Sequence, residues 1–257
     1  MYSWVDKCVA VVLIADDSEN ILGRILIKMT KFIHTTHGEN LNRNIGVEEN
    51  LMWNRKRWGQ EAGWKEHDKY GYNWSSGKYV HKASSLAKKF DYFFRPFTSG
   101  RYDLNILEIS PGAGRSTVEF LRYADRMTLV DMNSEPLRIC RERLRYYPNE
   151  IEYIHNDGIS LTDITAKDFD AVVSYDSLVH AHPEIVRKYI NQSFFMIRCG
   201  GFLWFDHSGK GERDLGMRSN VTDELVLNWG KEAGFVIEAQ IFRNEWDCIS
   251  VLRKVKT

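Results

Sequence analysis

Three acidic side chains stand near the ends of short apolar segments, where folding can bring them together. They are Glu108, Asp131 and Asp157, in or just after the segments 105–109, 127–132 and 151–155. Short apolar runs of this kind are typical of strands buried in a parallel sheet. Open α/β sheets bind their ligands beyond the carboxyl ends of the strands. The sequence therefore predicts that three carboxylates surround one ligand.

The turn after the first segment has the residues that close approach of a ligand requires. It reads Ser110, Pro111, Gly112, Ala113 and Gly114, and a helical pattern follows over 115–121. Gly112 and Gly114 lack a Cβ, so the backbone can turn tightly there. A dinucleotide fold would carry G-x-G-x-x-G at this turn. Glu108 would repel a phosphate but suits a cationic cofactor.

Histidines and carboxylates also follow the fourth and fifth expected strands, 169–175 and 201–205. They are Asp176, His180, Asp206 and His207. Histidine accepts a proton readily near neutral pH, so we predict His180 as a general base, with Asp176 orienting it or the acceptor and His207 as the alternative base. We expect His182, which precedes Pro183, to bond to backbone at a helix start.

The same four side chains are oxygen and nitrogen donors, and a divalent ion held by them would acidify a hydroxyl. Their spacing is not diagnostic of a metal site, unlike H-E-x-x-H. No metal ligand is therefore predicted, and a divalent metal stays the less favoured alternative.

Strands and helices alternate along residues 101–257, which predicts an α/β fold. Expected helices cover 84–94, 135–146, 184–197 and 221–233, and the segments 235–242 and 247–253 read as two closing strands. This alternation with a terminal β-hairpin predicts a mostly parallel, seven-stranded sheet. We place the domain boundary near residue 100, after a helical N-terminal extension over 1–100.

Aromatic residues are unusually dense in 51–74. We assign Trp53 and Trp58 to the core, whereas Tyr72 and Trp74 are expected in a lid that contacts substrate. Basic residues between the aromatics would also suit a nucleic acid. Lys and Arg number 35 and Asp and Glu number 35, so no net charge attracts a polyanion and nucleic acid is the second choice.

Composition gives further expectations about the cellular setting. The four cysteines form no C-x-x-C pair, which favours reduced thiols in the cytoplasm. The apolar run 8–15 is too short to span a bilayer, and no signal-peptide cleavage pattern follows it. We expect a cytoplasmic protein without a membrane partner.

Several blocks of the sequence resemble class I S-adenosylmethionine-dependent methyltransferases, in particular the sugar O-methyltransferases of polysaccharide and glycan biosynthesis. The similar blocks are ILEISPGAGRST, NDGISL, SYDSLVHAHPEIVRKYI, GGFLWFDHSGKG and EWDCISVLRK, within residues 51–254. In this family the fold is Rossmann-like with a C-terminal β-hairpin. Two positions depart from the family pattern: Ser110 replaces a small residue, and Asp206-His207 stands where relatives carry paired histidines.

The resemblance implies a role for each matching position. It implies that the cofactor S-adenosylmethionine contacts Glu108, Ser110, Gly112, Gly114, Arg115, Asp131, Met132, Asp157, Gly158 and Tyr175. Asp176, His180 and His207 would face the acceptor hydroxyl, and Asp206 would contact the substrate. The implied activity is methylation of a sugar hydroxyl, with a deoxyhexose such as rhamnose as an example. A nucleic-acid methyltransferase, another small-molecule methyltransferase and a non-catalytic cofactor-binding domain remain alternatives, and a homodimer or a larger glycan-assembly protein remains open.

Overall fold

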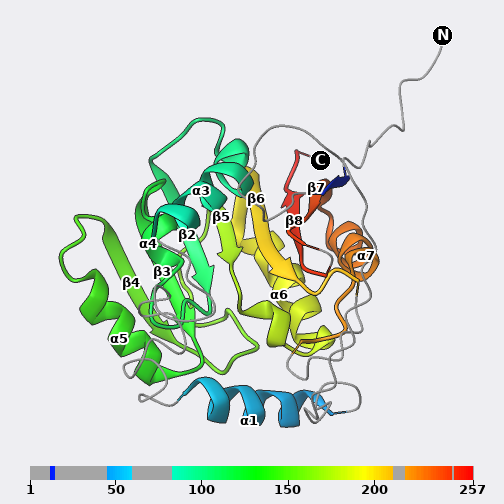
Figure 1. Cartoon of the computed structure of the whole chain (residues 1–257), viewed down its shortest axis with the longest axis horizontal. Helices are drawn as coiled ribbons and strands as arrows, with labels where there is room; N and C mark the ends of the chain where they lie inside the picture. The colour runs from blue at the N-terminus through cyan, green and yellow to red at the C-terminus, as the bar shows by residue number, and fades with distance from the viewer. Residues whose placement is uncertain (1–11, 15–44, 60–82, 211–217, 245, 257) are drawn as a thin grey trace.

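The computed structural model describes residues 12–14, 45–59, 83–210, 218–244 and 246–256. Its centre is one sheet of eight strands in the order β1-β7-β8-β6-β5-β2-β3-β4 (Figure 1). The strands are β1 (Val12–Ile14), β2 (Leu104–Ile109), β3 (Ala124–Asp131), β4 (Glu150–His155), β5 (Phe169–Ser174), β6 (Ile197–His207), β7 (Val236–Phe242) and β8 (Cys248–Arg253). Among the strands of the described residues, only β8 runs antiparallel to its neighbours, β6 and β7.

Helices cover both faces of the sheet because its strands are apolar on both sides. One core cluster joins α3 (Ala83–Phe93), α4 (Thr117–Phe120) and α5 (Ser134–Leu144) to strand residues such as Ile106 and Trp204. The other joins α6 (Pro183–Met196) and α7 (Asp223–Ala233) to residues such as Leu107 and Leu203. Adjacent residues of one strand therefore enter opposite clusters, as the alternation of side chains along a strand requires.

Helix α1 (Val47–Trp58) lies apart from both faces. It runs across the edge of the sheet at the bottom of Figure 1, beyond the carboxyl ends of β2 and β5. That edge also carries the 3-10 turn η2 (Leu178–His180) between β5 and α6. The 3-10 turn η1 (Arg95–Thr98) follows α3.

The predicted α/β fold with a mostly parallel sheet and a C-terminal hairpin is confirmed, with two differences in detail. Strand β1, within the apolar run 8–15, adds an eighth strand parallel to β7 that the sequence analysis did not predict. The helix expected over 115–121 is reduced to α4 because Arg122 and Tyr123 bond back three residues, to Glu119 and Phe120, and β3 begins at Ala124. The boundary near residue 100 stays a prediction.

Candidate functional site

The turn after β2 is built around positive backbone angles. Ser110, Gly112 and Gly114 have φ of 57°, 56° and 81°. A Cβ on Gly114 would lie 2.7 Å from the Sγ of Cys140 in α5, so this glycine allows helix and turn to pack closely. The backbone N–H of Ser110 donates to the carbonyl of Val130 at 2.7 Å, which fixes the turn to β3.

Glu108 is a carboxylate held almost entirely out of water. It is 1% exposed, and the hydroxyl of Ser116 donates to its Oε1 at 3.2 Å. Its Oε2 is also buried and has no hydrogen-bond partner among the described residues. Burial raises the pKa of Glu108 to about 7. A buried carboxylate oxygen without a donor suits a cationic ligand.

Asp131 and Asp157 follow the next two strands, as predicted. Asp131 is buried and accepts hydrogen bonds from the backbone N–H groups of Gly112, at 3.2 Å, and Asn133, at 2.9 Å. Burial raises its pKa to about 6. Asp157 is exposed, and its Oδ1 accepts from the backbone of Ile159 and Ser160. The acidic ends of β2, β3 and β4 thus lie at the same edge of the sheet.

Met132 and Gly158 lie together beside these carboxylates. A Cβ on Gly158 would lie 2.8 Å from the Sδ of Met132, and Gly158 has a φ of 88°. A side chain at this position would therefore be strained by both the backbone angle and the contact.

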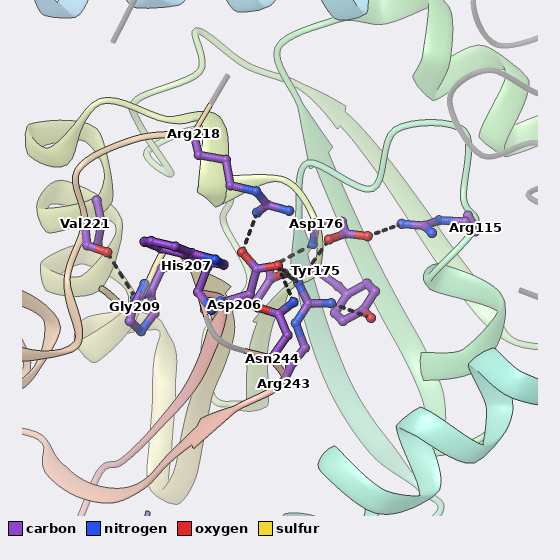
Figure 2. Close-up of polar contacts among 12 residues, drawn as sticks. Arg115, Tyr175, Asp176, Asp206, His207, Gly209, Arg218, Val221, Arg243 and Asn244 are labelled. Atoms are coloured by element: carbon purple, nitrogen blue, oxygen red, sulfur yellow. Dashed lines mark hydrogen bonds and ion pairs between the residues drawn. The ribbon is translucent and has the colours of Figure 1, made fainter. Parts of the chain in front are cut away.

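A partly buried cluster of arginine and aspartate, with Asp206 at its buried centre, links the ends of β5 and β6 (Figure 2). Asp176, with φ of 56°, accepts from Arg115 at 2.7 Å and from Arg243 at 3.2 Å. Arg243 also donates to Asp206 at 2.7 Å, and the backbone N–H of Asp176 donates to Asp206 at 2.8 Å. Two predicted site residues, Asp176 and Asp206, are therefore brought into direct contact.

Opposed effects set the charge of the two aspartates. Burial alone would raise the pKa of Asp176, but Arg243 and Arg115 outweigh it and hold that pKa well below its usual range. Burial raises the pKa of Asp206, although Arg243 opposes the rise. Asp176 is therefore the firmly ionised member of the pair.

Arg243 is the residue that the sequence analysis missed. It follows the end of β7 with its side chain 12% exposed, and its pKa is raised: partial burial would lower it, but Tyr175, Asp206 and Asp176 outweigh that effect. It donates to the hydroxyl of Tyr175 at 2.8 Å, and the Tyr175 ring stacks on Trp204. The available signal was its place at the turn of the predicted hairpin, beside the strand that ends on Asp206.

His180 and His207, the two candidate bases, differ in their surroundings. The ring of His180 is half-buried and lies 5.0 Å from the Trp58 ring between centroids. Trp58 also packs against the small cluster formed by Ala113 of the glycine turn and Ile139 of α5, so His180 stands near the predicted cofactor loop.

His207 is fully buried. Its Nε2 lies 2.8 Å from the hydroxyl of Ser250, and its Nδ1 accepts from the N–H of Gly209 at 3.1 Å. Burial lowers its pKa to about 4. This placement argues against His207 as the base. His182 accepts the N–H of Glu184 and caps α6, as predicted.

The remaining predictions about the site fall outside these contacts. Tyr72 and Trp74 lie outside the described residues. Within the described ranges, no group of three or more His, Cys, Asp or Glu side chains could hold a metal ion. No helix in that part of the chain is long and apolar enough to cross a membrane.

Comparison with known proteins agrees with this geometry. Residues 106–201 match the family described as a methyltransferase domain. No curated protein matches the chain.

Three solved structures show the same fold at low sequence identity. Magnesium protoporphyrin IX methyltransferase (ChlM) from Synechocystis PCC 6803, with bound S-adenosylmethionine, has a TM-score of 0.60 and 13% identity over 82% of this chain and 99% of its own. N-methyltransferase NodS from Bradyrhizobium japonicum WM9, in complex with S-adenosylhomocysteine, has a TM-score of 0.60 and 16% identity over 80% of this chain and 100% of its own. PH0226 from Pyrococcus horikoshii OT3 has a TM-score of 0.59 and 17% identity over 74% of this chain and 97% of its own.

The matched family spans β2 to the start of β6, which includes the glycine turn, the three acidic strand ends and Asp176. The buried, unpartnered oxygen of Glu108 and the glycine turn fit a cationic nucleoside cofactor. Residues 106–201 therefore match a methyltransferase domain, within a sheet that has the fold of the methyltransferases named above.

Proposed function

We propose that this methyltransferase acts on a hydroxyl group of a sugar during glycan biosynthesis, with a deoxyhexose such as rhamnose as the representative acceptor. The observation that carries the proposal is the polar character of the edge next to the cofactor loop. Asp176, Asp206 and Arg243 lie there in direct contact, and His180 stands beside the same loop. Alternating donors and acceptors suit a polyhydroxylated ligand better than an apolar one.

The chemistry requires alignment and removal of one proton. S-adenosylmethionine supplies a sulfonium methyl group. A sugar hydroxyl is a poor nucleophile until a base takes its proton, and the half-buried His180 is the candidate base. Asp176, fixed by two arginines, would accept a hydrogen bond from the acceptor or orient it. Helix α1 lies over this edge and would exclude water from it.

Other acceptors receive less support. The similar structures include an N-methyltransferase and a magnesium protoporphyrin IX methyltransferase, so the fold does not choose the acceptor. Against base N-methylation, β5 continues as Ser174-Tyr175-Asp176-Ser177 and lacks the D/N-P-P-aromatic element. A nucleic acid is further disfavoured by the net charge of zero.

Mass spectrometry of methyl transfer from S-adenosylmethionine to a panel of simple glycosides tests the proposal. The panel should include amino sugars and an oligonucleotide, and each reaction should be run with and without a chelator. We expect a gain of one methyl on a sugar hydroxyl that survives chelation and falls at least about a hundredfold in His180→Ala. Methylation of only the amine or the oligonucleotide would overturn the sugar hydroxyl as acceptor.

A further inference from the structure

Helix α1 contacts the loops that follow all four strands at the cofactor edge. Trp58 packs against the cluster of Ala113, after β2, and Ile139, and a Cβ on Gly59, the residue after α1, would lie 3.0 Å from the Oδ1 of Asn133 after β3. Arg55 donates to the carbonyl of Asp157 after β4 at 3.2 Å. The contacts after β5 are to the turn that carries His180. The helix therefore spans the edge where the cofactor is expected.

The helix is docked largely through amide groups. Its buried residues are Asn50 and Asn54, which are 1% and 5% exposed. Val47 and Leu51 are only partly buried against the core. Amides are stable in a buried helix face only when they are hydrogen-bonded. Docking of α1 therefore depends on the partners of these two asparagines.

Three of their hydrogen bonds reach the backbone of His180 and His182, and the Nδ2 of Asn54 also donates to the carbonyl and the Oδ1 of Asn50 within α1. The Nδ2 atoms of Asn50 and Asn54 each donate to the carbonyl of His180 at 3.1 Å. The Oδ1 of Asn50 accepts the N–H of His182 at 3.0 Å. The Oδ1 of Asn54 accepts the indole N–H of Trp58 at 3.1 Å, and the Trp58 ring lies against the ring of His180.

We propose that Asn54 and Trp58 are positioning residues, which hold α1 closed over the bound cofactor and fix the His180 ring for proton removal from the acceptor. The two functions are linked, because the contacts that dock α1 are made to the carbonyl and the ring of His180. The part that concerns His180 rests on the proposed function. The closing of α1 over the cofactor does not, because it requires no acceptor.

The first test measures closure without any acceptor. Asn54→Asp keeps the size of the side chain and its bond from Trp58 but removes the amide donor to His180 and to Asn50. We expect S-adenosylhomocysteine to dissociate about tenfold faster from this variant, since a buried donor bond is lost. Hydrogen exchange should show that bound S-adenosylhomocysteine protects the α1 amides in the original protein and protects them less in the variant.

Asn149→Asp is the matched control. The Nδ2 of Asn149 also donates to backbone carbonyls, those of Leu121 and Ala124, at the opposite edge of the sheet. In this control, the rate at which S-adenosylhomocysteine dissociates and the hydrogen exchange of the α1 amides should stay unchanged. Equal dissociation rates in Asn54→Asp and the original protein would overturn the role of α1 as the cofactor cover.

The second test separates positioning from simple stabilisation. Trp58→Phe keeps an aromatic ring beside His180 and loses the indole N–H, whereas Trp58→Ala loses both. In single-turnover methyl transfer, which excludes product release, we expect Trp58→Phe to retain most of the rate and Trp58→Ala to lose at least about tenfold. Thermal melts verify that both variants fold.

The outcomes distinguish the two proposals. Equal single-turnover rates in Trp58→Ala and the original protein would overturn the positioning of His180. If Asn54→Asp speeds release but no sugar is methylated by any form, the cover over the cofactor stands and the proposed sugar acceptor fails.

Discussion

Glu108 shows how a single residue is suited to a ligand at a cost to the free protein. Its unpartnered, buried oxygen is expensive when ionised, so burial raises its pKa from 4.5 to about 7. Between pH 4.5 and about 7, Glu108 therefore holds a proton in the folded protein that it has released in the unfolded chain. The free energy of unfolding should therefore fall as pH rises from 4.5 to 7, by on the order of 3 kcal/mol from this group.

Glu108→Gln tests this directly because an amide of the same shape does not titrate. Urea unfolding of the ligand-free proteins at several pH values should show that the free energy of unfolding of the variant, relative to that of the original protein, rises by about 3 kcal/mol between pH 4.5 and 7. Asp131 and His207 titrate in both proteins, so their effects cancel in the difference. The same variant should bind S-adenosylmethionine at least about tenfold more weakly at pH 8. A pH-independent difference in stability would contradict the raised pKa.

Arg243 is predicted to be a main support of the charged cluster. Arg243→Met leaves Asp206 buried without its closest cation, and Asp176 with one arginine in place of two. Removing one partner of a buried ion pair costs about 3–5 kcal/mol, so urea unfolding should show a loss of that size. Arg187→Met is the control, because Arg187 and Glu232 are 52% and 56% exposed and their pair should contribute less than about 1 kcal/mol. Similar losses in the two variants would contradict the burial of the cluster.

The two histidines show what a sequence can predict at the residue scale. Both follow predicted strands, and residue type and position made both candidates, with His180 preferred over His207. The expected strand 201–205 ended two residues too early: β6 spans Ile197–His207, and His207 pairs with Cys248 of β8. The pairing buries His207. The register of β6 against β8, which is distant in sequence, cannot be inferred from the sequence, so the burial of His207 could not be predicted.

At the scale of elements, the packing of the glycine turn on α5 is the contact most open to test. Gly114→Ala must adopt φ near 81° and place its Cβ 2.7 Å from the Sγ of Cys140. Gly100→Ala is the control, since Gly100 has φ of 75° and no atom within 4 Å of the added Cβ. Both should lose about 1–2 kcal/mol to the backbone angle, and Gly114→Ala about 1–3 kcal/mol more to the contact.

Adding Cys140→Ala should remove the loss that Gly114→Ala owes to the contact with Sγ. A double-mutant cycle measures this recovery as a coupling energy. Additive losses would show that Cys140 does not limit the turn.

The elements themselves were predicted well where apolar periodicity was strong. Helix α7 ends at Ala233, before Gly234 with φ of 100°, and α3, α5, α6 and α7 lie within two residues of their expected bounds. Helix α1 was different. Trp58 was assigned to the core, but it is only partly buried and lies between Ala113 and His180. A helix docked by asparagines has no apolar stripe from which its partner can be inferred.

At the scale of the whole molecule, the strand order gathers the site. The central strands β5, β2 and β3 are neighbours although β2 and β5 are about sixty residues apart, and their carboxyl ends meet under α1 (Figure 1). The mostly parallel alternation predicted this edge from the sequence. The arginine cluster depends on the last hairpin returning beside β6, so Arg243 joins the site only through the complete sheet.

A ligand that binds this edge should therefore stabilise the whole fold. At a concentration one hundred times its Kd, S-adenosylhomocysteine should add about 2.7 kcal/mol, which for a chain of this size raises Tm by about 5–10 °C in a thermal melt. NAD is the control, because Glu108 opposes a pyrophosphate and the turn lacks G-x-G-x-x-G. We expect no shift with NAD at the same concentration. Equal shifts from the two ligands would mean that the edge recognises adenosine alone, and that the carboxylate of Glu108 does not select a cationic cofactor.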